Sequence, residues 1–156
     1  MEKKVIIDKM YELAKLIDYA PNNIEYLKEA MYCQSLENKK DEYADESLAT
    51  LGDAVLKLIL TEHLYRKHYN KAEITNVKQA IEKNETLSKL CNKYKIYQYA
   101  YNDTYFFTEA PLDKQLPHSE HDFYIEAIIG AIYQDRGMKY CKNWVIQFFQ
   151  RNSYPL

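Results

Sequence analysis

Apolar residues recur at every third or fourth position along most of the chain, and they do not alternate cleanly with polar residues. A spacing of three and four is the period of an α-helix that buries one face. Only three glycines and four prolines interrupt the 156 residues, so few breaks between helices are expected. The pattern therefore predicts an all-α fold, organised as a helical bundle.

The clearest element is a long central helix from about residue 45 to residue 69. Gly52 lies inside this helix, where it costs about 1 kcal/mol relative to alanine, and this suggests the close approach of another helix, from the same chain or from a second subunit. Glu46 and Asp53 are seven residues apart, about two turns, so they project from one side of the helix. The apolar positions that predict its buried face are Leu48, Leu51, Val55 and Leu58.

The same periodicity predicts shorter helices on both sides of the central one. The first is expected to pack on the domain as a unit of residues 1–20, which leaves residues 21–156 as the main domain. The last is expected to bring Trp144, Val145, Phe148 and Phe149 to the core. The predicted ranges are about 3–19, 24–36, 74–90 and 90–99, a helix that starts near residues 119–122, and 138–151.

Three cysteines, Cys33, Cys91 and Cys141, lie far apart in the sequence, and none forms a Cys-x-x-Cys pair. This spacing favours small core residues over a disulfide framework or a thiolate zinc site. An intracellular, reducing compartment is expected, with the cytoplasm as the default and the nucleus or an organelle left open. No apolar run approaches the ~18 residues that a membrane span needs, so a membrane location has no support.

The formal net charge of −2 does not suit a protein that binds polyanions over its whole surface. The charges are unevenly distributed, however. Between residues 66 and 95 there are eight lysines and arginines against three glutamates, whereas the five acids between residues 41 and 53 have no cation among them. An acidic cleft with a basic rim is what metal-dependent cleavage of a nucleic acid requires, although a basic helix face is more often merely solvated.

Two acidic stretches carry the strongest signal in the sequence. Residues 46–56 read ESLATLGDAVL, and residues 126–137 read EAIIGAIYQDRG. Both resemble blocks of the ribonuclease III family, in the right order and about 70 residues apart, and two such blocks are far more specific than one. The resemblance covers about residues 24–150. It implies a ribonuclease III endonuclease domain that hydrolyses double-stranded RNA with Mg2+ or Mn2+, as a homodimer whose two clefts face opposite strands.

The family places acids at four metal-ligand positions, and two of these match here. By this resemblance, Asp53 and Glu126 are expected to be catalytic and to hold the metal. Ala49 and Phe123 stand at the other two positions, where the compact mini-ribonuclease III branch also departs from the family. Asp122 precedes Glu126 by four residues and lies within about 60° of the same helix face. We therefore expect Asp122 to reach the cleft as a further catalytic and metal-binding acid.

Other polar residues are expected to assist this site. Glu46 is expected to support catalysis as an outer acceptor near the metal, although a charge at a helix start is also stabilised by the helix dipole. His118 and His121 have the spacing of metal ligands, but the preceding proline predicts a helix start, so capping is their expected use. The lysines predicted to contact RNA phosphates are Lys78, Lys83 and Lys89.

Ala49 and Phe123 also favour an alternative function. A catalytically degenerate domain would keep the helical dimer surface and serve as an RNA-binding or scaffolding subunit of a ribonucleoprotein. A heterodimer with a complete partner domain would keep one active cleft. The nuclease hypothesis requires that folding bring Asp53 and Glu126 together, and it fails if each of them is neutralised by a lysine or an arginine.

Overall fold

The computed structural model describes residues 2–33, 46–109 and 123–156. Within these ranges the regular elements are helices, because the isolated bridges that join Tyr101 to Tyr32 and to Phe106 do not extend into strands. The all-α expectation is confirmed. The elements are α1 (Lys3–Leu16), α2 (Glu25–Met31), α3 (Glu46–Arg66), α4 (Lys71–Glu82), α5 (Asn84–Lys93) and α6 (Phe123–Arg151), with the short 3-10 helices η1 (Ile96–Tyr99) and η2 (Phe107–Glu109).

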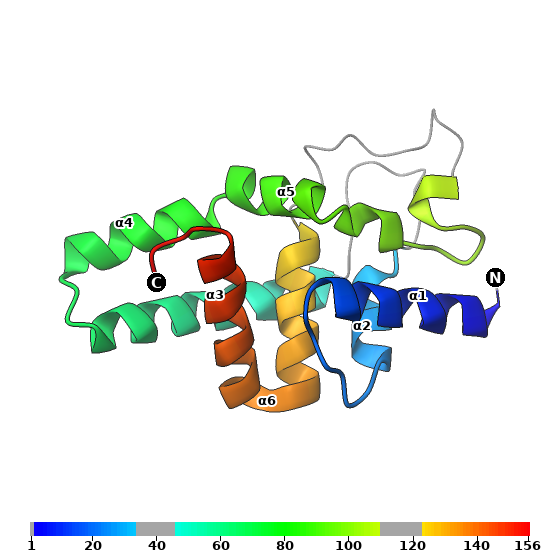
Figure 1. Cartoon of the computed structure of the whole chain (residues 1–156), viewed down its shortest axis with the longest axis horizontal. Helices are drawn as coiled ribbons and strands as arrows, with labels where there is room; N and C mark the ends of the chain where they lie inside the picture. Colours follow the sequence, from blue (N-terminus) through cyan, green and yellow to red (C-terminus); the bar gives the residue numbers. More distant parts are fainter. Residues whose placement is uncertain (1, 34–45, 110–122) are drawn as a thin grey trace.

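Helices α3 and α6 cross at the centre of the molecule (Figure 1). Each contributes a glycine to the crossing. A Cβ atom at Gly52 would overlap the carbonyl oxygen of Glu126, and one at Gly130 would overlap the carbonyl oxygen of Leu48. Backbone therefore packs directly on backbone, which a side chain at either glycine would prevent. The close approach that Gly52 suggests is confirmed, and the helix that approaches belongs to the same chain.

Helix α6 consists of two arms, residues 123–136 and 138–151, joined at Gly137. Gly137 has φ 79° and ψ 178°, a conformation that essentially only glycine adopts without strain. The two arms run side by side (Figure 1), and the thiol of Cys141 on the second arm lies 3.7 Å from the carbonyl oxygen of Ile129 on the first. The predicted start of a last helix near residue 138 is thereby confirmed.

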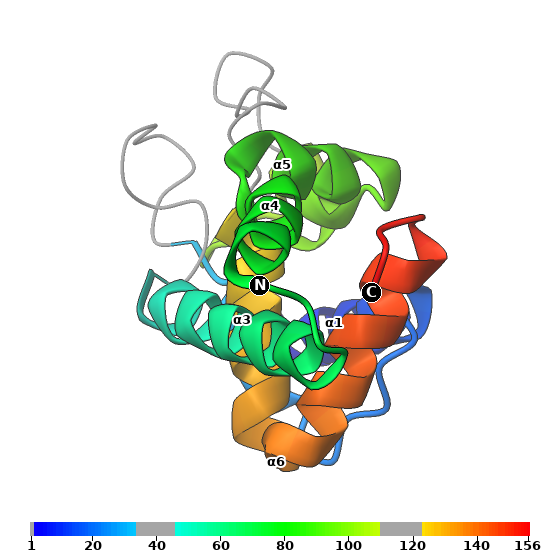
Figure 2. The ribbon, with the colours of Figure 1, turned by 90° about the vertical axis from the view of Figure 1, so that its left-hand side faces the viewer.

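Helices α4 and α5 form a layer in which α4 lies over α3 (Figure 2) and α5 packs against α6. Asn70 begins α4 with a capping box, in which its side chain accepts from the backbone N–H of Glu73 at 2.9 Å. The carboxylate of Glu73 in turn accepts from the backbone N–H of Asn70 at 3.0 Å. Ile81 is fully buried and Val77 packs beside it against the core. This apolar face fixes the orientation of α4 on the rest of the molecule.

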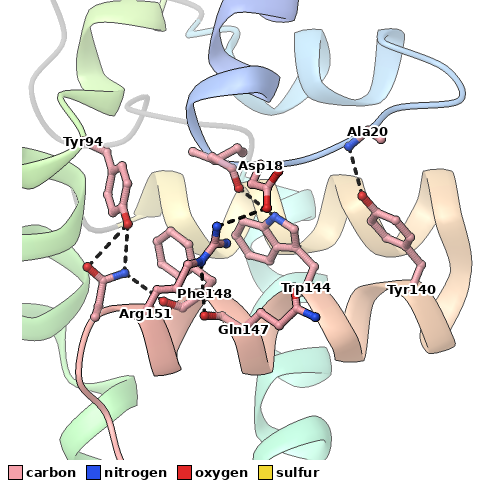
Figure 3. A network of polar contacts seen from close by, with 10 residues as sticks. Asp18, Ala20, Tyr94, Tyr140, Trp144, Gln147, Phe148 and Arg151 are labelled. Atoms are coloured by element: carbon pink, nitrogen blue, oxygen red, sulfur yellow. Dashed lines mark hydrogen bonds and ion pairs between the residues drawn. The ribbon is translucent and has the colours of Figure 1, made fainter.

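The N-terminal segment packs against the second arm of α6 through polar contacts (Figure 3). The indole N–H of Trp144 donates to the carbonyl of Ile17 at 3.0 Å, and Arg151 pairs with Asp18 at 3.1 Å. The buried residues of α1 belong to the same core as those of α3 and α6. Helix α1 therefore shares the core of the domain, and the division into residues 1–20 and 21–156 stays a prediction.

The first arm of α6 holds the turn after α1 through Asp135. The hydroxyl of Tyr19 donates to this carboxylate. The backbone N–H groups of Asn22 and Asn23 donate to it at 2.9 Å and 2.8 Å. A single side chain thus satisfies three donors of the segment that connects α1 to α2.

Five predicted helix ranges are wrong. Helix α1 ends at Leu16, before residue 19, and α2 ends at Met31, before residue 36, because Tyr32 is extended with ψ 126°. Helix α3 ends at Arg66, before residue 69, because His68 has a left-handed backbone with φ 65°. The predicted helix 74–90 begins earlier and is two helices, since Lys83 is extended with ψ 146°. The predicted helix 90–99 is broken at Lys95, whose φ of 53° lies outside the helical region. Local backbone conformations of this kind give no periodic signal.

The buried face predicted for α3 is right for Leu48 and Val55, partly right for Leu51 and wrong for Leu58, which is 55% exposed. The line of contact with α6 passes through Gly52, so Leu56, Ile59 and Leu60 enter the core instead. The four core residues predicted for the last helix are all buried. The three cysteines are buried and form no disulfide, and burial raises the pKa of the Cys141 thiol to about 12. In the described part of the chain, no helix is both long enough and apolar enough to cross a membrane.

Candidate active site

The crossing of α3 and α6 brings Asp53 and Glu126 to one place. Gly52, the neighbour of Asp53, lies against the backbone carbonyl of Glu126. Both carboxylates are partly buried, and both act electrostatically on the same lysine, Lys57. Folding therefore joins the two acidic stretches as the sequence predicts. Their catalytic and metal-binding roles stay predictions.

Lys57 lies one helical turn after Asp53 and pairs with it. Its ammonium nitrogen is 2.5 Å from Oδ1 of Asp53, and the two side chains are 48% and 43% exposed. The hydrogen bond with Asp53 raises the pKa of Lys57, burial opposes this rise, and the charges of Asp53, Glu82 and Glu126 add to it. Asp53 thus has a cationic partner, because an aspartate and a lysine four residues apart on a helix face each other.

Glu82 is a third acid of this region, and the sequence alone did not identify it. It is the last residue of α4, and its Oε1 atom is buried without a hydrogen-bond partner. Burial raises the pKa of its carboxyl group, the charge of Asp53 adds to the effect, and Lys57 and Lys78 oppose it. The sequence shows that Glu82 follows an apolar position, Ile81, but it does not show the packing of α4 on α3 that brings Glu82 to this region.

These side chains fit a hard divalent cation in donor type. Mg2+ takes oxygen ligands, keeps several waters and is commonly bound through one or two carboxylates together with substrate phosphates. Asp53 and Glu126 supply two carboxylates from different helices. Over the described ranges, no group of three or more His, Cys, Asp or Glu side chains is arranged to hold a metal ion. A cation at this crossing would therefore be bound by few protein ligands.

The remaining predicted site residues are placed to different extents. Glu46 begins α3 and Phe123 begins α6, but their side chains lie outside the described part of the structure. Asp122, His118 and His121 also lie outside the described residues. The structure therefore places neither the outer acceptor nor the third metal ligand that the sequence predicts.

Ala49, which stands where the family has an acid, is 6% exposed and belongs to the core. This chain thus has a buried apolar residue at that position.

The three lysines predicted to contact RNA lie on the layer formed by α4 and α5. Lys78 is partly buried and close enough to Glu82 to lower the pKa of its carboxyl group. Lys83, between the two helices, and Lys89, on α5, are exposed. In this layer α4 packs on α3 (Figure 2) and α5 packs on α6, so the lysines lie on helices next to the two that carry the acids. Contact with RNA stays a prediction.

Comparisons with known proteins agree with the two acidic blocks. Residues 46–137 match the ribonuclease III domain family. Ribonuclease 3 of Mycoplasma genitalium is 27% identical over 155 residues, which are 97% of this chain and 56% of that protein. Ribonuclease 3 of Phocaeicola vulgatus is 30% identical over 142 residues, which are 82% of this chain and 41% of that protein. The chain thus spans about half the length of these curated relatives.

Solved structures give the same result for the fold. A crystal structure of the nuclease domain of ribonuclease III from Campylobacter jejuni superposes with a TM-score of 0.72 at 25% identity, over 100% of this chain and 99% of that one. A second structure of that domain, described as flexible in a region involved in dimer formation, gives a TM-score of 0.71 at 24% identity, over 94% and 97% of the two chains. The fold is that of a ribonuclease III nuclease domain, and the chain belongs to the ribonuclease III family.

Proposed function

We propose that this chain is a divalent-metal-dependent endoribonuclease that hydrolyses phosphodiesters of double-stranded RNA during RNA processing. The observation that carries the proposal is the meeting of Asp53 and Glu126 at the backbone contact between α3 and α6. Membership of the ribonuclease III family supports the reaction class.

In this proposal Asp53 and Glu126 hold Mg2+ or Mn2+, with Asp122 as a further ligand and Glu46 as an outer acceptor. When bound, such an ion supplies a Lewis acid that favours attack of water on a phosphodiester. The exposed pair of Asp53 and Lys57 does not prevent this, since ion pairs between exposed side chains contribute about 0–1 kcal/mol. A divalent cation that binds a carboxylate directly competes readily with such a pair.

The basic layer supports binding of a polyanion beside the cleft. Lys83 and Lys89 are exposed there, and Lys78 lies closer to the acids. Lysines neutralise phosphates at any sequence, which suits recognition of duplex RNA by its shape and backbone. The predicted phosphate contacts are therefore kept as part of the proposal.

An exposed apolar face of α3 supports a homodimer. Leu58 is 55% exposed and Tyr65 is 72% exposed. They are seven residues apart, about two turns, so they share one face of the helix that carries Asp53. Large apolar side chains exposed together on one helix mark an interaction surface. A second copy related by a two-fold axis would cover this face and place two clefts on one duplex, whereas a heterodimer would cover it with a different domain.

The cytoplasm is the compartment that we propose. The three cysteines form no disulfide in the structure, which suits a reducing environment.

A non-catalytic, RNA-binding or scaffolding subunit is the second candidate. Two observations favour it. Ala49 is a buried apolar residue at a position where the family has an acid, and Lys57 pairs with Asp53. This candidate shares the fold and the basic layer with the nuclease. It differs in predicting binding of duplex RNA without cleavage.

The decisive experiment is incubation of the purified chain with labelled duplex RNA and Mg2+ or Mn2+. A nuclease is expected to give staggered cuts, and Asp53→Asn is expected to reduce the cleavage rate by at least about 100-fold, since loss of groups that merely support a metal ligand already costs 10–100-fold. Asp8→Asn is the matched control, because Asp8 is an exposed acid on α1. Binding without cleavage in either metal would favour the scaffold.

A further inference from the structure

Two observations at the crossing are unexplained by the family resemblance. Lys57 pairs with Asp53, the carboxylate that a metal needs. Glu82 keeps a carboxylate oxygen buried and without a donor. A buried polar atom without a partner is costly, and among the described residues only His63 has another side-chain oxygen or nitrogen of this kind.

The two observations concern neighbouring groups. Glu82 and Lys57 act electrostatically on each other, and both also interact with Asp53. Glu82 comes from α4, whereas Asp53 and Lys57 come from α3. The ammonium group of Lys57 makes its hydrogen bond to Asp53, and the charge of Glu82 on the neighbouring helix acts on it as well.

We propose that Glu82 is a positioning residue that receives Lys57 when a divalent cation binds Asp53. Lys57 then leaves Oδ1 of Asp53 and donates to Oε1 of Glu82, so no buried charge is left without a partner. The long, flexible side chain of lysine suits such an exchange. This inference rests on the proposed metal site at Asp53, and it assigns a role to a residue outside both family blocks.

A role of this kind has a definite energetic signature. Lys57 competes with the cation for Asp53, so its removal should tighten cation binding. Glu82 lowers the free energy needed to displace Lys57 from Asp53. Removal of the Glu82 carboxylate should therefore weaken cation binding, mainly in proteins that retain Lys57. The two substitutions should therefore be strongly coupled, as residues that share one interaction are.

The test is titration of the metal-free protein with Mn2+, with free Mn2+ followed by electron paramagnetic resonance. Lys57→Met is expected to tighten binding by about two- to fivefold, the range of an exposed ion pair. Glu82→Gln is expected to weaken binding by a similar factor. In the Lys57→Met background, the effect of Glu82→Gln is expected to fall to half or less. Glu85→Gln, an exposed glutamate in the first turn of α5, is the matched control.

A second measurement needs no metal. Glu82→Gln is expected to raise the melting temperature of the metal-free protein near pH 7, because it removes a charge from a buried atom that has no donor. Glu85→Gln should leave it unchanged. A lower melting temperature for Glu82→Gln would mean that Glu82 serves the fold, and it would overturn the proposal.

The outcomes separate this inference from the proposed function. If Glu82→Gln weakens Mn2+ binding as much in the Lys57→Met background as in the parent, or more, then Glu82 acts as a direct metal ligand or as a general negative charge. The exchange would then be rejected. Unchanged Mn2+ binding in Asp53→Asn would instead reject the metal site on which the nuclease proposal depends. Loss of binding in Asp53→Asn together with uncoupled effects at Lys57 and Glu82 would overturn only the exchange.

Discussion

Asp135 and Asp53 represent two regions that use carboxylates in opposite ways. Asp135 accepts from the hydroxyl of Tyr19 and from two backbone N–H groups, and it fastens the segment between α1 and α2 to α6. Asp53 has an exposed lysine from its own helix as its ion-pair partner. Near it, Glu82 has a buried oxygen with no donor at all.

The difference separates groups that stabilise the fold from groups left open for a ligand. Several fixed donors around one acid contribute to stability, and they leave no room for another partner. An acid held by one mobile lysine contributes little and exchanges its partner easily. Local stability is commonly lower where a site must bind something else.

The largest effect is expected from Gly52→Ala, which would disrupt the packing of α3 on α6, the helix that contributes to both regions. The new methyl group would overlap the carbonyl of Glu126, and backbone cannot move aside as a flexible side chain can. We expect a loss of about 3 kcal/mol in the free energy of unfolding, at the upper end of overpacking costs, measured by urea denaturation. Ala54→Ser, at an exposed position of the same helix, should cost far less. A stable Gly52→Ala variant would mean that the two helices can move apart at their crossing and accommodate a methyl group.

A matched pair of alanine substitutions tests the comparison directly. Asp135→Ala is expected to cost about 2 kcal/mol, because it leaves the hydroxyl of buried Tyr19 and two backbone N–H groups without their acceptor. Asp53→Ala is expected to change stability by less than about 1 kcal/mol, the limit for an exposed pair. Both values come from urea denaturation without metal. Equal costs at the two positions would remove the distinction between the regions.

The smallest effect concerns His63, whose Nε2 atom is buried without a partner outside both regions. Burial lowers the pKa of His63 below its ordinary value of 6.5, and Lys67 and Lys142 act in the same direction. The unfolded chain therefore binds a proton at higher pH than the folded one. This contribution to stability is present above about pH 6.5 and is lost as the pH falls through the lowered pKa of the folded state.

The measurement for His63 is urea denaturation at pH 7.5 and at pH 5.5. His63→Asn is expected to lose less stability than the parent between the two values. His68→Asn is the control, since His68 is exposed with a left-handed backbone that asparagine tolerates. An unchanged pH dependence in His63→Asn would show that another group causes the loss.

Much of the fold follows from periodicity and glycine placement. Gly52 indicates a close helix partner and Gly137 ends the second acidic block, and both features are found. Leu58 shows the limit, because a periodic pattern identifies an apolar stripe without saying which part of it another helix covers. The exposure of Leu58 depends on where α6 crosses α3, and this is a property of the tertiary structure.

The candidate site could be predicted only in part. Asp53 and Glu126 stand in recognisable blocks, whereas Glu82 stands in an ordinary amphipathic helix outside those blocks. Its importance comes from α4 folding back over α3, a contact that one sequence does not display. The pairing of Lys57 with Asp53 was within reach of helical spacing alone, since the two are four residues apart.

The meeting of Gly52 and Gly130 has an evolutionary consequence. The separation of α3 and α6 is set by main-chain atoms, so it does not depend on the size of any neighbouring side chain. An acid near this crossing can be lost, as at Ala49, without moving α3 relative to α6. An acid can also be supplied from another helix, as Glu82 would be. The set of metal-binding side chains can therefore change during evolution while the packing of the two helices stays the same.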